Sequence, residues 1–298
     1  MHTTTYNKSL RFGALALVAA AALSACGGGN SVEPSLELNL GGLEDLGPNA
    51  VYEGWLIVNG APVTTGRFTV NATGQLSQSN FTVSRDNADA ASAFVLTIEP
   101  AVNDLPAPTD THLIAGDFNA DKTSATLSTA HAAALGTNFS AATASFILAT
   151  PTSAASDDED QGIWFLNMVN GAPQASIAAP TLPKGWGYEG WVVVNGKPIS
   201  TGRFTKFNAA DSDGAGPAAG PLGFPPFPGQ DFVNPGTKLP GGMAVISVEP
   251  EPDNSPAPFT LKPLVGPIGA SLAPTAQTMN NTVGSGGALP RGSVALSR

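Results

Sequence analysis

The stretch YEGWLIVNGAPVTTGRFT at residues 52–69 decides the expected fold, because it recurs at residues 188–205 as YEGWVVVNGKPISTGRFT. Thirteen of the eighteen positions are identical in the two copies. Each copy sets Asn-Gly between two runs of strand-forming residues, and Asn-Gly accepts the positive φ angles of a tight hairpin turn. Pro62 has no N–H to donate, so we expect it in the turn or on an edge strand, and Gly66 suits a β-bulge. The repeat therefore predicts two β-hairpins of one design.

A second pair of similar stretches follows each hairpin. FVLTIEPAVNDLPAPTDTHLIAG spans residues 94–116, and AVISVEPEPDNSPAPFTLKPLVG spans residues 244–266. The offset between copies grows from 136 to 150 residues, so the second copy carries an insertion of fourteen residues. The Gly- and Pro-rich segment 209–230 accounts for it, and we expect that segment to be a surface loop.

The composition favours short strands over long helices. The chain has 298 residues, of which 34 are Gly and 26 are Pro, and turn signals separate its apolar runs. We predict an all-β protein with two tandem β-sandwich-like domains related by duplication. The one segment where a short helix fits lies around Ala133. The predicted organisation is a signal peptide at 1–25, a tether at 26–34, a first β domain at 35–152, an acidic linker at 153–161 and a second β domain at 162–298.

Each predicted domain opens and closes with a strand. Residues 35–40 would open the first domain and residues 144–150 would close it. Residues 162–168 would open the second domain and residues 292–298 would close it. In an alternative division, 162–168 pairs with 144–150 and belongs to the first domain. The sequence leaves both divisions open.

The N-terminus has the pattern of a bacterial lipoprotein signal. Lys8 and Arg11 precede an apolar run of about a dozen residues, which is too short to span a bilayer. LSAC follows and ends at Cys26, the one cysteine of the chain. We predict that Cys26 is lipidated and anchors the protein to a membrane of the bacterial envelope, the outer membrane where one is present. The alternative is an ordinary signal peptide with an incidental cysteine.

The charge balance argues against some partners. Without Lys8 and Arg11, eleven basic and twenty-three acidic side chains remain, a net charge of about −12. Such a surface repels phosphate backbones, so nucleic acid is not an expected partner.

The two repeats resemble the extracytoplasmic C-terminal domain of anti-sigma-K factors. The matched positions are Trp55, Gly60, Pro62, Gly66, Phe68, Glu99 and Pro100, and again Trp191, Gly196, Pro198, Gly202, Phe204, Glu249 and Pro250. The resemblance implies a β fold outside the cytoplasm for both domains. Such factors also carry a cytoplasmic sigma-binding domain and a transmembrane helix, and a lipoprotein leader stands in their place here. We therefore expect no direct binding of a sigma factor.

Few residues indicate chemistry. Glu53 and Arg67, with Glu189 and Arg203 in the second copy, are candidate binding residues, although structural ion pairs repeated by duplication explain them better. Asp117, Asn119 and Asp121 have the spacing of a calcium loop, but Lys122 and Ser128 stand where such loops need Gly and Glu, so turn formation is favoured. His112 and His131 stand alone, without a second ligand at metal spacing. Trp55 and Trp191 are expected core residues.

Two function classes remain. The favoured one is a non-enzymatic envelope lipoprotein that binds a protein or wall component or takes part in envelope sensing, without a cofactor. The alternative is an extracytoplasmic hydrolase acting on glycans, whose paired carboxylates only folding would bring together. The first class is favoured because the repeated residues are mostly turn formers and apolar anchors.

Overall fold

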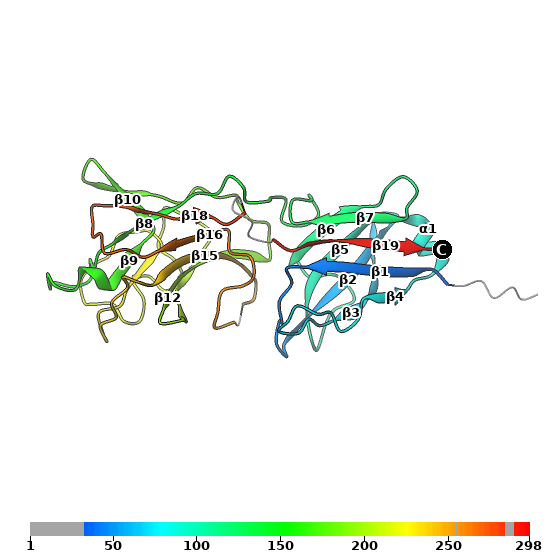
Figure 1. Ribbon diagram of the computed structural model, residues 1–298, viewed down its shortest axis with the longest axis horizontal. Coiled ribbons are helices and arrows are strands. Elements are labelled where there is room, and N and C mark those ends of the chain that lie inside the picture. The colour runs from blue at the N-terminus through cyan, green and yellow to red at the C-terminus, as the bar shows by residue number, and fades with distance from the viewer. Residues whose placement is uncertain (1–32, 254, 284–288) are drawn as a thin grey trace, which may run out of the picture. The chain divides into compact units, whose positions relative to one another are not determined.

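The structure is a computed structural model, and it describes residues 33–253, 255–283 and 289–298 (Figure 1). The predicted signal peptide, Cys26 and the tether up to residue 32 lie outside the described residues. Strands make up 43% of the structure and helices 3%, which confirms the all-β prediction. In the described part of the chain, no helix has the length and apolar character needed to cross a membrane.

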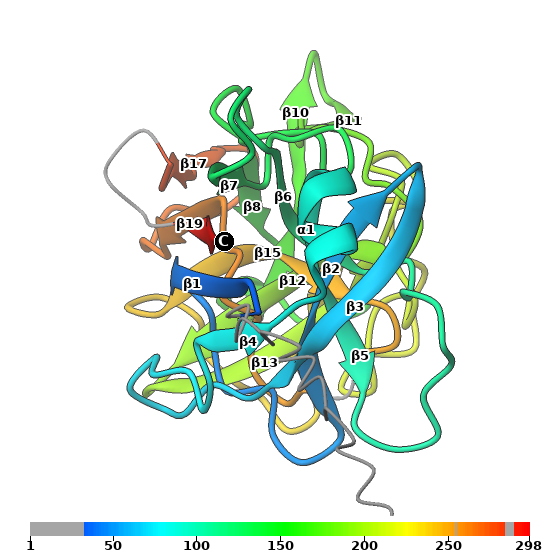
Figure 2. The same cartoon turned by 90° about the vertical axis from the view of Figure 1, so that its right-hand side faces the viewer.

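Eight antiparallel strands form the first sheet, in the order β3-β2-β5-β6-β7-β19-β1-β4. The end strands β3 and β4 contact each other, so this sheet is nearly barrel-shaped (Figure 2). The strands are β1 (Ser35–Gly41), β2 (Ala50–Val58), β3 (Ala61–Phe68), β4 (Asn80–Thr82), β5 (Ala91–Pro100), β6 (His112–Asp117), β7 (Ser124–Ser128) and β19 (Arg291–Ser297).

Three further sheets complete the fold. One has the order β13-β12-β15-β16-β18, a second has the order β14-β9-β8-β17, and β10 and β11 form a separate hairpin. Their strands are β8 (Ser145–Leu148), β9 (Gly162–Trp164), β10 (Leu166–Val169), β11 (Ala172–Ala175), β12 (Trp186–Val194), β13 (Lys197–Phe204), β14 (Gly229–Asp231), β15 (Met243–Pro250), β16 (Leu264–Pro267), β17 (Gln277–Thr278) and β18 (Asn280–Asn281).

The described helices are short. α1 (Arg85–Ala90) begins after Ser84, whose side chain accepts a hydrogen bond from the backbone N–H of Asn87. A 3₁₀ turn, η1 (Glu159–Gln161), precedes β9. The helix expected around Ala133 is not formed, because that segment makes turns instead.

The two predicted hairpins form as the sequence indicates. Asn59 and Gly60 have φ angles of 51° and 80°, and Asn195 and Gly196 have 52° and 75°. Pro62 lies in β3 and Pro198 lies in β13, and each of these is the edge strand of its sheet. An edge strand needs no donor on its outer side, so both prolines fit there.

The two hairpins also share their pairing register. Tyr52 lies opposite Phe68 in β2 and β3, and Tyr188 lies opposite Phe204 in β12 and β13. The pairing register shifts between Gly54 and Trp55 in the first hairpin and between Glu189 and Trp191 in the second. Each shift indicates a β-bulge. The strand orders β3-β2-β5-β6 and β13-β12-β15-β16 correspond as well.

Close packing explains the glycine in each YEGW segment. A Cβ on Gly54 would lie 2.7 Å from the ring of Phe94, and a Cβ on Gly190 would lie 2.8 Å from the ring of Phe165. Trp55 and Trp191, one residue later, are both only 2% exposed. The repeated segment therefore brings a strand backbone against an aromatic ring and buries an indole.

The C-terminal strand was expected to close the second domain, and this expectation is wrong. β19 pairs with β1 along its whole length, from Arg291 opposite Gly41 to Ser297 opposite Ser35, and with β7 on its other side (Figure 1). Val294 and Leu296 supply the inward apolar face that this position in the first sheet requires. The first sheet thus contains strands from both ends of the described chain.

The segment 153–161 was expected to link the two domains, and the structure assigns it another place. It connects β8 to β9, which pair with each other through Ile147 and Trp164. β8 therefore does not close the first sheet. The pairing of 144–150 with 162–168 is as the alternative division has it, but both strands lie in the sheet of β14 and β17 and not in the first sheet. The acidic side chains bond to both near and distant parts of the chain: Glu159 accepts from the N–H of Thr150 at 2.9 Å, and Asp160 pairs with Lys238 at 2.8 Å.

The Gly- and Pro-rich insertion is a loop over residues 209–228. Its last two residues, Gly229 and Gln230, enter β14. Asp211 holds the loop together by accepting from the N–H of Gly229 at 2.8 Å. The segment is thus a loop over most of its length, and its last residues join a strand.

Candidate functional site

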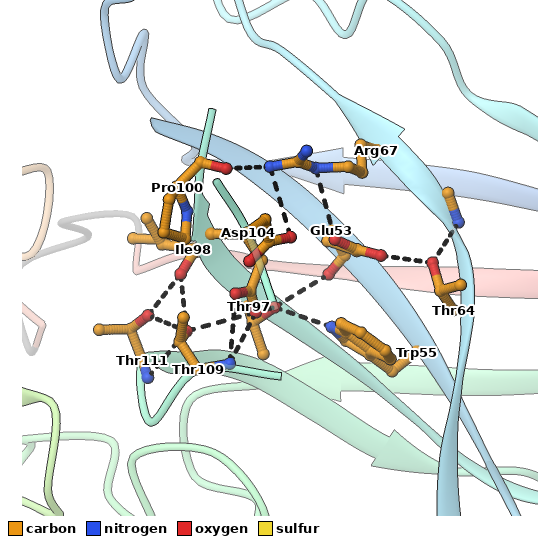
Figure 3. Close-up of polar contacts among 12 residues, drawn as sticks. Glu53, Trp55, Thr64, Arg67, Thr97, Ile98, Pro100, Asp104, Thr109 and Thr111 are labelled. Carbon is orange, nitrogen blue, oxygen red and sulfur yellow. Dashed lines mark hydrogen bonds and ion pairs between the residues drawn. The ribbon is translucent and has the colours of Figure 1, made fainter. Parts of the chain in front are cut away.

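The first hairpin brings together Glu53 and Arg67, as the candidate binding pair requires. The two residues lie opposite each other in β2 and β3, with Arg67 Nε 3.4 Å from Glu53 Oε2 (Figure 3). Thr64 donates a hydrogen bond to the other oxygen of Glu53. Arg67 also donates to the carbonyl of Pro100 and lies 3.6 Å from Asp104. The guanidinium therefore ties the hairpin to the end of β5.

The second hairpin repeats this arrangement, but its arginine lies closer to a different glutamate. Arg203 Nε is 3.9 Å from Glu189 Oε2, and Ser200 donates to Glu189 Oε1. Arg203 forms its closer ion pair with Glu251 and donates to the carbonyl of Pro250 at 3.4 Å. Burial raises the pKa of Glu189 to about 7, an effect that Ser200 offsets in part by hydrogen bonding and Arg203 in part by its charge.

A chain of hydrogen bonds starts at each repeated tryptophan. Trp55 Nε1 donates to Thr97 Oγ1 at 2.9 Å (Figure 3). Thr97 in turn donates to Glu99. The backbone N–H of Thr109 donates to Glu99 Oε1 at 2.9 Å. Glu99 is 1% exposed, so it fixes the loop after β5 from inside the protein.

The second copy has the same chain with serine in place of threonine. Trp191 Nε1 donates to Ser247 Oγ at 2.8 Å, and Ser247 donates to Glu249 Oε1. The N–H of Phe259 donates to the same oxygen at 2.9 Å. Burial raises the pKa of Glu249 to about 7, against the hydrogen bonds that it accepts.

Both glutamates belong to the lining of one cavity of about 450 Å³. Its other carboxyl residues are Glu44, Asp45, Glu251 and Asp253, and no Lys, Arg or His is found among the described residues that line it. Most of the remaining lining is apolar, with Leu46, Pro48, Ala50, Ile98, Pro100, Pro250, Pro252, Pro256 and Phe259. A concave surface of this composition is a candidate binding site.

Glu44 is a partly exposed carboxyl residue of this lining whose pKa is shifted. Burial raises its pKa to about 7, although Lys262 and the backbone N–H of Thr260 favour its charged form. Burial lowers the pKa of Lys262, and the charges of Glu44 and Glu249 act against that shift. Lys262 is thus the nearby cation, but it is not part of the lining.

The calcium-like residues form a turn between β6 and β7. Asn119 Oδ1 accepts from the N–H of Thr123 at 2.8 Å, and Lys122 has a φ of 53°. Asp117 lies 3.4 Å from His131, and Asp121 uses its carbonyl to accept from Arg298. In the described part of the chain, no three His, Cys, Asp or Glu residues are placed to hold a metal ion. The other histidine of the described residues, His112, contacts the carbonyl of Ala133 at 2.9 Å.

Sequence reasoning did not assign a role to Glu99 or Glu249, nor to the hydroxyl residues beside them. The signal was present in the repeats: TIEP at 97–100 and SVEP at 247–250 both place a hydroxyl two residues before a glutamate. Residues two apart in a strand share one face, so the hydroxyl and carboxyl could be expected to meet. The cavity could not be anticipated, because it depends on how distant loops come together.

Comparison of the chain with protein-family models, curated proteins and solved structures finds no match. The resemblance to the anti-sigma-K domain thus rests on the matched sequence positions and stays a prediction.

Proposed function

We propose that this protein is a non-enzymatic lipoprotein of the bacterial cell envelope, extracytoplasmic and anchored through lipid on Cys26. Its acidic cavity would bind a protein or a wall component, either as an adaptor or in envelope sensing. One observation carries the proposal: the repeated Glu, Trp and Arg side chains bond to partners within their own sheets. These residues therefore serve folding, and the cavity is the feature left to meet a ligand.

We also propose that the two hairpin units arose by duplication from an ancestor shared with the anti-sigma-K C-terminal domain. The identical positions, the matching strand orders and the two Trp–hydroxyl–Glu chains support this origin. The proposed role includes no direct contact with a sigma factor.

Binding is favoured over glycan hydrolysis for a geometric reason. A glycosidase needs two carboxyl groups that reach the scissile bond from either side. Glu99 and Glu249 are 1% and 0% exposed, and both accept hydrogen bonds from their own strand and loop. These hydrogen bonds fix both carboxyl groups within the fold instead of leaving them free to flank a scissile bond.

Photo-crosslinking in living cells tests the binding role. A photo-reactive residue would replace Asn49, an exposed residue of the cavity lining, and the matched control would replace Thr73, an exposed turn residue outside the lining. We expect a discrete adduct from position 49 that is missing from position 73. Equal labelling at both positions, or release of sugar fragments by the purified protein from isolated cell wall, would overturn the proposal.

The anchor is tested separately. Cys26→Ser should move the protein from the membrane fraction to the soluble extract, or leave an unprocessed precursor. A Cys26→Ser protein that still fractionates with lipid after a high-salt wash would rule out lipid attachment at this residue.

A further inference from the structure

The ionisable side chains that line the cavity are all acidic. Six carboxyl residues belong to its lining, and the described lining contains no basic side chain. Asp45 and Glu251 are exposed, Glu44 is partly exposed, and Glu99 and Glu249 are buried. Carboxyl groups thus lie in both the solvent-exposed part and the buried part of the lining, and low-dielectric surroundings strengthen the effect of each ionised carboxylate on a bound cation.

The apolar part of the lining restricts the ligand further. Nine of the lining residues are Leu, Pro, Ala, Ile or Phe. A hydrated metal ion gains nothing from such surfaces, whereas an organic cation buries its carbon stem against them. An anionic ligand would be repelled by the carboxylates.

A second, independent observation is a buried acceptor in the lining that has no hydrogen-bond donor. Glu249 is fully buried in the cavity lining, yet its Oε2 has no hydrogen-bond partner among the described residues. Its Oε1, in contrast, accepts from both Ser247 and the N–H of Phe259. Lys262 interacts with Glu249 through its charge but makes no hydrogen bond to this oxygen. A buried carboxyl oxygen without a hydrogen-bond donor is costly, and a donor on a bound cation would relieve that cost.

We infer that the cavity binds an organic cation, namely an alkylammonium or guanidinium group on a short apolar stem. The stem packs on Leu46, the prolines and Ile98, and the charged head lies among the carboxylates with Glu44 and Asp45 nearest to solvent. The cation is either a free amine or the basic side chain of a peptide. This inference rests on the proposed binding function and names the chemistry of its ligand.

Calorimetric titration of the full chain in a non-ionic detergent tests the inference. The probe is n-butylammonium, and 1-butanol and butyrate are its neutral and anionic counterparts. We expect saturable binding of the cation alone. Glu44→Gln combined with Asp45→Asn should weaken it about tenfold or more, because loss of paired charge at a site is expressed in its affinity. Both replacements keep an oxygen acceptor, so the amide contacts of Thr260 and Gly47 are preserved.

The matched control is Glu37→Gln, which removes an exposed carboxylate of β1 outside the lining. It should bind n-butylammonium as the parent protein does. Two further probes distinguish the sources: 1,5-diaminopentane represents free amines, and a short peptide with one central lysine represents peptide side chains. Tighter binding of 1,5-diaminopentane would assign the ligand to the free amines, and tighter binding of the lysine peptide would assign it to peptide side chains.

Equal binding of 1-butanol, or no saturation by any cation in the millimolar range, overturns the inference. An unchanged affinity in the folded double variant does so as well. The position-49 adduct in cells would still form in each of these cases if the protein binds a partner of other chemistry. The two proposals therefore fail separately.

Discussion

Trp191 and Ser247 are joined by a hydrogen bond of 2.8 Å from the indole Nε1 to the hydroxyl Oγ. Ser247 donates a hydrogen bond to Glu249, and Trp55, Thr97 and Glu99 repeat the arrangement in the first sheet. A hydroxyl has one donor and two acceptor positions, so it can serve the indole and the carboxylate together. Removal of one member leaves a buried polar atom without its partner, which is destabilising.

Loss of the central hydroxyl should therefore weaken the fold. Thr97→Val and Ser247→Ala should each lower the free energy of unfolding by about 1–3 kcal/mol, because the indole N–H and a carboxylate oxygen lose a buried partner. Urea denaturation followed by circular dichroism measures this change. Thr126→Val, on the exposed face of β7, is the matched control and should stay close to the parent protein. A Thr97→Val protein as stable as the parent would contradict the structural role of the chain.

The repeated tryptophans should behave as core residues. Trp55→Ala and Trp191→Ala should each cost about 3–5 kcal/mol, as truncation of a large buried side chain does. Single-tryptophan variants that retain Trp55 or Trp191 should resist quenching by iodide, since both side chains are 2% exposed. Ready quenching in a variant that is still folded would instead favour a recognition surface built on the indoles.

The acidic core should make the protein more stable in mild acid. Burial raises the pKa of Glu44, Glu189 and Glu249 from about 4.5 to about 7. Between these values the folded state binds more protons than the unfolded state, so the stability that these groups contribute is fully present below about pH 4.5, is lost as the pH rises through 7 and changes little above 8. Urea midpoints at pH 5 and pH 8 measure the effect.

Glu249→Gln is the matched variant for this dependence. It should reduce the difference in unfolding free energy between pH 5 and pH 8 by roughly 1–3 kcal/mol, because one of the titrating groups is gone. A parent protein that is more stable at pH 8 than at pH 5 would show that other groups dominate its titration.

Local signals in the sequence predicted local structure well. Asn59-Gly60 and Asn195-Gly196 determine their turns because few residues accept positive φ, and Pro62 and Pro198 restrict their strands to sheet edges. The Glu–Arg pairs followed from the same register, since a hairpin turn fixes which residues lie opposite each other.

Pairing between distant strands could not be predicted in this way. The alternating pattern of residues 292–298 is compatible with any half-buried strand, and nothing in it specifies β1 and β7 as neighbours. The cavity carboxylates were hidden for a similar reason. Glu44, Glu99 and Glu249 are far apart in sequence and line one cavity only because the ends of β5 and β15 come together with the segment between β1 and β2.

The bulge glycine of the first hairpin offers a test of backbone strain. Gly66 has a φ of 127°, and a Cβ there would lie 2.8 Å from the ring of Phe81. Gly60, in the turn of the same hairpin, has a φ of 80° and no atom within 4 Å of such a Cβ. Gly60→Ala should cost about 1–2 kcal/mol from its backbone conformation alone, and Gly66→Ala should cost more because Phe81 must also move. Equal costs in thermal denaturation would contradict the close approach.

Removal of the C-terminal strand should disturb the first sheet and leave the sheet of β12 and β15 unchanged. A chain ending at Pro290 lacks β19, so β1 keeps only its short pairing with β4, and β7 keeps one residue pair with β6. Backbone amides in β1 and β7 should then exchange with deuterium much faster, because exchange follows the loss of protecting hydrogen bonds. Mass spectrometry of peptides from these strands measures the change, and peptides from β12 and β15 serve as the internal reference. Leu296→Ala, which truncates a buried side chain of β19, should shift the same peptides in the same direction. Faster exchange confined to β16 and β18 would mean that the C-terminal strand closes the second unit, as its sequence position first suggested.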